Sequence, residues 1–244
     1  MLELKHISFS VMEETGQQKK ILKDINLTID TDTFVVITGP HGGGKSTLAK
    51  IIMGIEKPSQ GTILFKGQDI TNLDIHERAK LGMGFAFQQP VRFKGLTVRD
   101  LLHLSTSKQK SDQELSQYLT EVGLNASNYI NREINASLSG GELKRIEIAM
   151  LMARGVDLSL FDEPEAGIDL WSFHNLIKVF EQIRDTKRGA VVIISHQERI
   201  LNIADKIVVI SNGEIDTVGT RDEILPKLLS QSDTYQFHKV REQQ

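Results

Sequence analysis

The sequence predicts an α/β fold with a parallel sheet, and three observations lead to this class. "FVVIT" at residues 34–38 is a continuous apolar run, which is typical of a strand buried on both faces. The glycine-rich segment after it leads into residues with helical spacing. From about residue 141 to 211, helix-like and strand-like segments alternate, which favours a sheet with helices on both faces.

The N-terminal part reads mainly as strands. Residues 2–11 and 21–29 alternate apolar and polar side chains, and a turn-rich segment separates them. "GTILFKGQDI" at 61–70 resembles a further strand pair. These segments predict an antiparallel β subdomain beside the parallel sheet. Between them, residues 45–55 form a predicted helix, because Leu48, Ile51, Ile52 and Ile55 share one face.

The middle of the chain differs from both flanks. Residues 89–137 contain no convincing strand, whereas "TVRDLLHLS" and "DQELSQYLTEVGL" read as short amphipathic helices, so we expect a helical insert. From Leu225 we expect a surface helix that frays. The predicted core, which includes the β subdomain, consists of residues 1–88 together with 138–225. The helical subdomain covers residues 89–137, and the C-terminal tail covers residues 226–244.

The alternation after the insert defines the rest of the predicted core. It begins with a helix at 141–154 and a strand at 158–162. A long helix at 171–186 and a strand at 190–195 follow, and then a short helix at 198–204 and a strand at 206–211. No internal repeat or low-complexity segment interrupts this order.

Composition narrows the functional classes. Of the 244 residues, 39% are hydrophobic and 25% are charged, which suits a soluble globular protein. The net charge is −3 with both signs interspersed, so bulk charge does not favour a nucleic-acid partner. No cysteine is available for a disulfide or a metal-bound thiolate. We also find no apolar run of about 20 residues and no signal-peptide pattern at the start, so we expect a cytoplasmic protein.

The first functional motif is "GPHGGGKST". Its Gly39, Gly44, Lys45 and Ser46 match the P-loop pattern, and the motif lies between a predicted strand and a predicted helix. Glycines let consecutive backbone N–H groups surround a polyphosphate, and the helix start adds a favourable dipole. The expected nucleotide-binding residues are Gly39, Pro40, His41, Gly42, Gly43, Gly44, Lys45, Ser46 and Thr47, with Lys45 on the β- and γ-phosphates and Ser46 on Mg²⁺. We assign His41 no individual role.

A second motif, "LFDE", supplies carboxylates. Asp162 ends an apolar strand, where it can hold Mg²⁺ directly or through water. Glu163 follows and points elsewhere because strand side chains alternate, so it can polarise a water for attack on the γ-phosphate. Two acidic residues at a strand end are also common in surface turns. The P-loop in the same chain favours the catalytic interpretation.

A third motif, "LSGGE", opens the helix at 141–154. Ser139, Gly140 and Gly141 therefore stand at a helix N-terminus, which is a second device for binding an anion. Taken alone, these residues are merely a good helix start.

Together, the P-loop, "LSGGE", "LFDE", "AGID" and the histidine of "VVIISH" resemble an ABC-type ATPase over nearly the whole chain. The resemblance implies a P-loop NTPase fold of the ABC-cassette type, with ATP and Mg²⁺ as ligands. It also implies a dimer of two copies, in which the Ser139 segment of one copy contacts the γ-phosphate bound to the other. Gln88 resembles the glutamine that contacts Mg²⁺ or the attacking water, although a buried glutamine at a strand end is the alternative.

Two further positions follow from the same resemblance. Asp169 resembles the aspartate that crosses the dimer interface, and His196 the histidine that contacts the γ-phosphate. Val11 stands where members often carry an aromatic residue against adenine, so the resemblance implies an apolar contact and weaker selectivity for the base. Hydrolysis would then combine Glu163, Gln88 and His196 as catalytic residues with Ser46, Gln88 and Asp162 around the metal.

The finer resemblance is to the SufC-type ATPase of the SUF iron–sulfur cluster assembly system. Two stretches support this resemblance. One is "SGGE-x-KR", where Glu142 replaces the glutamine common in importers, and the other is "H-x-x-RIL", which begins at His196. This implies a cysteine-containing SUF scaffold as partner. Pro164 instead follows the importer pattern, so the ATP-binding subunit of an ABC importer, with a membrane permease as partner, is the alternative. A DNA-repair or translation module is a third reading, but the chain has neither a long coiled-coil insert nor two tandem cassettes.

Overall fold

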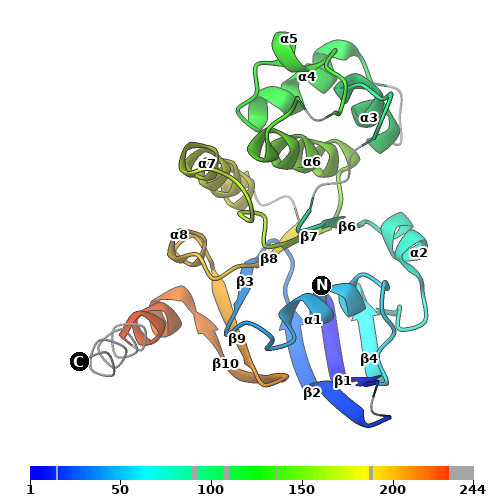
Figure 1. Ribbon diagram of the computed structural model, residues 1–244, viewed down its shortest axis with the longest axis vertical. Helices are drawn as coiled ribbons and strands as arrows, with labels where there is room; N and C mark the ends of the chain where they lie inside the picture. The colour runs from blue at the N-terminus through cyan, green and yellow to red at the C-terminus, as the bar shows by residue number, and fades with distance from the viewer. Residues whose placement is uncertain (15, 90–92, 107–109, 136, 187–188, 231–244) are drawn as a thin grey trace.

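The computed structural model describes residues 1–230 except 15, 90–92, 107–109, 136 and 187–188. Figure 1 shows an antiparallel sheet at one end, a central sheet, and a group of helices at the opposite end. Within the described residues no helix is both long and apolar enough to cross a membrane.

The central sheet is mixed. Its strands run in the order β10-β9-β3-β8-β7-β6, with every neighbouring pair parallel except β9 and β10. The bounds are β3 Phe34–Thr38, β6 Met83–Ala86, β7 Leu158–Asp162, β8 Ala190–Ile194, β9 Lys206–Ser211 and β10 Glu214–Thr220. The predicted α/β class with a parallel sheet is confirmed, with β10 as an antiparallel edge strand that the sequence patterns did not reveal.

The predicted antiparallel β subdomain is also present. It has the strand order β2-β1-β4-β5, formed by β1 Leu2–Met12, β2 Gln18–Ile29, β4 Gln60–Phe65 and β5 Gln68–Asp69. Val11 lies in β1 opposite Lys19 and is 37% exposed.

Two hydrophobic cores lie on opposite faces of the central sheet. Phe34 and Val36 of β3 belong to the core shared with the helices from the middle and the C-terminal half, whereas Val35 and Ile37 face α1 and the antiparallel sheet. Alternating side chains of one strand therefore enter both cores, which is why the run is apolar throughout.

The helices occupy both sides of the sheet. Their bounds are α1 Lys45–Ile52, α2 Ile75–Lys80, α3 Val98–Ser105, α4 Asp112–Glu121, α5 Ala126–Tyr129, α6 Gly140–Arg154, α7 Leu170–Thr186 and α8 Glu198–Leu201. Helices α3, α4 and α5 lie within the predicted insert and gather around α6 (Figure 1). Residues 221–230 are helical, while the rest of the expected tail helix, including Phe237, lies outside the described residues.

Helix α2 was missed by the sequence patterns, yet it supports α1. Arg78 of α2 is fully buried and donates hydrogen bonds to the carbonyls of Ile51 and Ile52 at the end of α1, at 2.7 and 2.8 Å. Burial lowers the pKa of Arg78 to about 10, although Asp69 opposes this effect. The guanidinium remains charged at neutral pH and places a cation against the carbonyls at the C-terminal end of α1, where positive charge is favourable.

Candidate functional site

The loop between β3 and α1 requires glycine for geometric reasons. Gly39 has φ 131°, and a Cβ there would lie 2.0 Å from the carbonyl oxygen of Ile210 in β9. Gly44 has φ 99° and caps α1 in a left-handed conformation. Side chains at these positions would force the loop away from the sheet, so the sequence pattern has a direct structural cause.

This loop encloses a cavity of about 330 Å³. The cavity is lined by residues 41–47, by Ile21 of β2 and by Glu163. The sequence analysis anticipated the loop and Glu163. It missed Ile21, because an apolar residue in an alternating strand carries no signal for a ligand.

Lys45 is held inside the loop. Its Nζ donates to the carbonyl oxygens of Gly39 and Pro40, both at 2.8 Å, and the residue is buried. Burial lowers the pKa of Lys45, whereas the carboxylates of Glu163 and Asp162 raise it. The lysine and the two carboxylates therefore interact electrostatically.

Ser46 and Asp162 meet although they are far apart in sequence. The Ser46 hydroxyl donates to Oδ1 of Asp162 at 3.1 Å. Burial raises the pKa of Asp162, the Ser46 hydrogen bond lowers it and Glu163 raises it. A hydroxyl and a carboxylate are oxygen ligands that suit Mg²⁺. Within the described residues, no group of three or more His, Asp or Glu could hold a metal, so Mg²⁺ here would need the nucleotide's phosphate oxygens as well.

Glu163 lies one residue beyond the end of β7. Its φ is 45°, a left-handed conformation that is uncommon for a residue with a side chain, and its N–H donates to the carbonyl of Ile194 at 3.0 Å. This turn, rather than continued strand alternation, separates the Glu163 side chain from that of Asp162. Nε2 of Gln88 donates to Oε2 of Glu163 at 2.7 Å, so these two predicted catalytic residues are in contact.

His196 follows β8 and is exposed, as is His41 in the loop. The two rings contact edge to face, with centroids 5.3 Å apart. The structure thus places His196 at the rim of the cavity that His41 lines. His41, to which the sequence analysis gave no individual role, is its neighbour there.

The "LSGGE" segment forms the start of α6. The Ser139 hydroxyl accepts the N–H of Glu142 at 3.2 Å, and the Glu142 carboxylate accepts the N–H of Ser139 at 2.6 Å. This reciprocal arrangement is a capping box. Ser139 and Gly140 are exposed and do not line the cavity at the P-loop of their own chain. Contact between Ser139 and a phosphate in the other copy therefore remains a prediction.

Asp169 caps the neighbouring helix α7. Its carboxylate accepts hydrogen bonds from the N–H groups of Trp171 and Ser172, at 2.9 and 3.0 Å. Hydrogen bonds from Ser172 lower the pKa of Asp169. A Cβ on Gly141 would lie 2.4 Å from Cβ of Ser172, so the starts of α6 and α7 pack closely.

The comparisons with known proteins agree with this geometry. A sequence model described as ABC transporter matches residues 22–166, which include the glycine-rich loop, Ser139 and both carboxylates. An uncharacterized ABC transporter ATP-binding protein from Methanocaldococcus jannaschii is 41% identical over 84% of this chain and 85% of its own length.

Two further relatives have names that refer to transport. The sulfate/thiosulfate import ATP-binding protein CysA of Synechocystis is 35% identical over 83% of this chain and 57% of its own length. A probable ATP-dependent transporter, ycf16, of Pyropia yezoensis is 34% identical over 90% of this chain and 91% of its own length.

Solved structures match nearly the whole fold. The ADP conformation of MJ1267, an ATP-binding cassette of an ABC transporter, superposes with a TM-score of 0.80 at 26% identity, covering 98% of each chain. A dimeric post-hydrolysis state of the cassette MJ0796 bound to ADP and Pi gives a TM-score of 0.79 at 26% identity, covering 91% of this chain and 99% of the other.

Proposed function

The chain belongs to the ABC transporter family of ATP-binding cassettes and is an ATPase, and we propose that the cavity at the P-loop binds ATP with Mg²⁺ for hydrolysis. Its fold is that of an ABC cassette, as the sequence predicts. The observation that carries the proposal is the convergence of Lys45, Ser46, Asp162, Glu163 and Gln88 around one cavity.

The residues divide the chemistry as follows. The loop N–H groups and Lys45 bind the phosphates, and Lys45 leaves the Gly39 and Pro40 carbonyls to do so. Ser46, Asp162 and Gln88 are the proposed residues around Mg²⁺, which when bound would neutralise charge on the phosphates. Glu163, oriented by Gln88, positions the attacking water, and His196 approaches the γ-phosphate from the cavity rim.

We infer that two copies of the chain close around ATP. Ser139 stands at an exposed helix start outside its own chain's cavity, which leaves it available to a phosphate held by another copy. Asp169 lies beside it through the contact of α6 with α7. The solved relative that was bound to ADP and Pi is dimeric, which supports this assembly.

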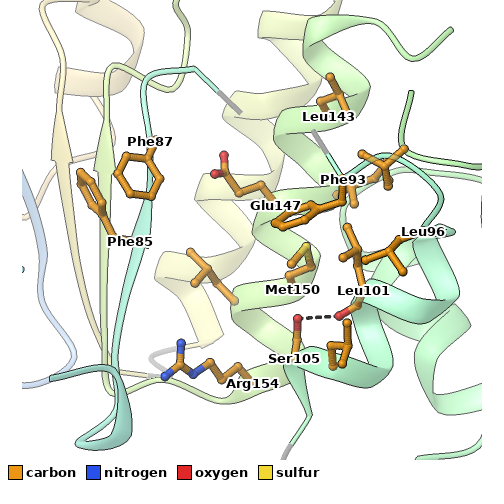
Figure 2. Close-up of a pocket in the computed structure, with 14 residues that line it drawn as sticks. Phe85, Phe87, Phe93, Leu96, Leu101, Ser105, Leu143, Glu147, Met150 and Arg154 are labelled. Atoms are coloured by element: carbon orange, nitrogen blue, oxygen red, sulfur yellow. Dashed lines mark hydrogen bonds between the residues drawn. The ribbon is translucent and has the colours of Figure 1, made fainter. Parts of the chain in front are cut away.

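A partner protein would dock in an apolar groove of about 450 Å³ next to Gln88. Figure 2 shows Phe85 and Phe87 on one side of the groove and Leu101 on the other, with Met150 of α6 between them. We propose an amphipathic helix of the partner as the occupant, because the lining is mainly apolar. Because Phe87 precedes Gln88 directly, a partner seated here would sense the state of the catalytic glutamine.

We favour a membrane permease as that partner and a cytoplasmic location for the chain. The names of the relatives reported above refer to transport, so the comparisons support the importer alternative better than the SUF interpretation. SUF assembly remains a second candidate on "SGGE-x-KR" and "H-x-x-RIL". Co-purification separates them: a multi-span membrane protein supports transport, whereas a cysteine-containing soluble scaffold supports SUF assembly.

The central test of the proposed function is Glu163→Gln. We expect kcat for ATP hydrolysis to fall at least ~100-fold, because the water loses its carboxylate partner, while ATP still binds. Sedimentation with ATP and Mg²⁺ should then show a persistent dimer. Glu214→Gln, at an exposed position of β10, is the matched control and should keep wild-type turnover. Full activity in Glu163→Gln would remove Glu163 from its role.

A further inference from the structure

We propose that Glu165 is a positioning residue that fixes the His196 segment for ATP hydrolysis. This inference rests on the proposed function and deepens it. Glu165 lies in the turn after β7, two residues beyond Glu163, and the sequence analysis gave it no role. The contacts of its carboxylate connect this turn to the segment after β8.

The connection runs through one buried hydroxyl. Oε1 of Glu165 accepts a hydrogen bond from Oγ of Ser195 at 2.5 Å, and Ser195 is completely buried. The same Oγ accepts the backbone N–H of Gln197 at 3.0 Å. Residues 195 and 197 flank His196, so the carboxylate holds the main chain on both sides of it.

The backbone around His196 is held by hydrogen bonds, whereas the His196 side chain is exposed. The His196 ring is exposed and contacts the ring of His41, which lines the cavity. A fixed backbone beneath a movable ring restricts the positions from which His196 can reach a phosphate in the cavity. Small displacements of a positioned group reduce turnover strongly, which gives this anchor a functional consequence.

The second carboxylate oxygen adds an independent observation. Oε2 of Glu165 is buried and has no hydrogen-bond partner among the described residues. A buried polar atom without a partner is rare in folded proteins and calls for an explanation. Burial raises the pKa of Glu165, while the Ser195 hydrogen bond and the charge of His196 lower it. We therefore assign Oε2 as a spare acceptor for the His196 segment when the nucleotide is bound.

The first experiment compares Glu165→Ala with Glu165→Gln. Glu165→Ala should lower kcat about 10-fold and leave KM for ATP unchanged, since the loop that binds the nucleotide is untouched. Glu165→Gln keeps an oxygen that can accept the Ser195 hydrogen and should retain most of the activity. Glu198→Ala, two residues beyond His196 and exposed, is the matched control and should match the wild type.

A double-variant cycle separates positioning from general loss of structure. If Glu165 acts through His196, Glu165→Ala should cause no further loss of kcat in a His196→Ala background. An equal fold-loss in both backgrounds, or wild-type kcat in Glu165→Ala, would overturn the inference. If Glu165→Ala does not fold, Ser195→Ala breaks the same link and is subject to the same outcomes. Absence of ATP hydrolysis in the wild type would instead refute the proposed function itself.

Discussion

At the residue scale, Lys45 shows how the loop and the carboxylates hold a buried cation. Its ammonium is buried but already bonded to two loop carbonyls, and the nearby carboxylates favour its charged form. A buried charge without such partners would be strongly unfavourable. The two carboxylates and the two carbonyls thus favour the ammonium form against the effect of burial, in the place where phosphate oxygens are expected.

Lys45→Ala should weaken nucleotide binding itself. We expect a loss of about 2 kcal/mol in the binding free energy of ATP, because a hydrogen-bonded charge opposite the phosphates disappears. Titration calorimetry with ATP measures it. Lys57→Ala, at an exposed position after α1, is the control and should bind as the wild type does. Equal affinities of Lys45→Ala and the wild type would contradict the assignment.

The sequence predicted the site where local chemistry determines it. The loop needs glycines that approach Ile210, followed closely by a lysine and a serine. Because these residues are neighbours in the chain, the sequence motif predicts the loop. The role of Glu165 was not, because it depends on Ser195, which lies far away in the chain. Only folding brings β7 and β8 together and makes that contact possible.

At the element scale, α6 links the "LSGGE" segment to Gln88. Lys144 of α6 is buried, and its Nζ donates to the carbonyl of Phe87 and approaches Oε2 of Glu147 at 3.4 Å. Phe87 immediately precedes Gln88. The helix that begins with the Ser139 segment is thereby joined, through Lys144, to the residue that precedes Gln88, the proposed catalytic glutamine.

Lys144→Met should destabilise the fold in a pH-dependent way. Burial raises the pKa of Glu147 and Lys144 lowers it, so removing Lys144 lets folded Glu147 keep its proton to higher pH. The folded form then binds more protons than the unfolded chain, and its stability falls as pH rises. We expect a loss of about 3 kcal/mol near pH 8 and a smaller one near pH 5, measured by urea unfolding.

Lys178→Met, at an exposed position of α7, is the control for this prediction and should unfold as the wild type does at both pH values. An equal loss of stability at both pH values would contradict the prediction, because it would show that the loss does not depend on the titration of Glu147.

Three elements that the sequence analysis missed have weak hydrophobic patterns, each for its own reason. Helix α2 has six residues and buries only Arg78, so it has no apolar period, and its sole signal was the capping box of Asp74 and Glu77. Strand β10 alternates partly exposed and exposed residues at the sheet edge. Strand β6 is only four residues long. By contrast, β3 and α1 were predictable because their apolar residues enter the core directly.

At the scale of the whole molecule, the proposed dimer should cover exposed apolar residues near Asp169. Leu170 and Trp171, in the first turn of α7, are 69% and 81% exposed. They lie beside the start of α6, which carries Ser139. A second copy that reaches Ser139 and Asp169 would also contact this turn.

Trp171 reports on that assembly because it is the chain's only tryptophan. In Glu163→Gln, addition of ATP and Mg²⁺ should shift the fluorescence emission to shorter wavelength as the indole leaves water. Lys45→Ala, which should bind ATP poorly, is the control and should show no shift. A dimer seen by sedimentation without any change in emission would place the start of α7 outside the interface.

The two hydrogen bonds from Lys45 to its own loop also have a consequence for the release of ADP. When ADP departs, the ammonium can return to the carbonyls of Gly39 and Pro40 instead of being stranded. In that arrangement both carbonyl oxygens accept from the Lys45 ammonium, so its charge has partners within its own loop. We therefore expect product release to exchange phosphate oxygens for these two carbonyl oxygens around the Lys45 nitrogen.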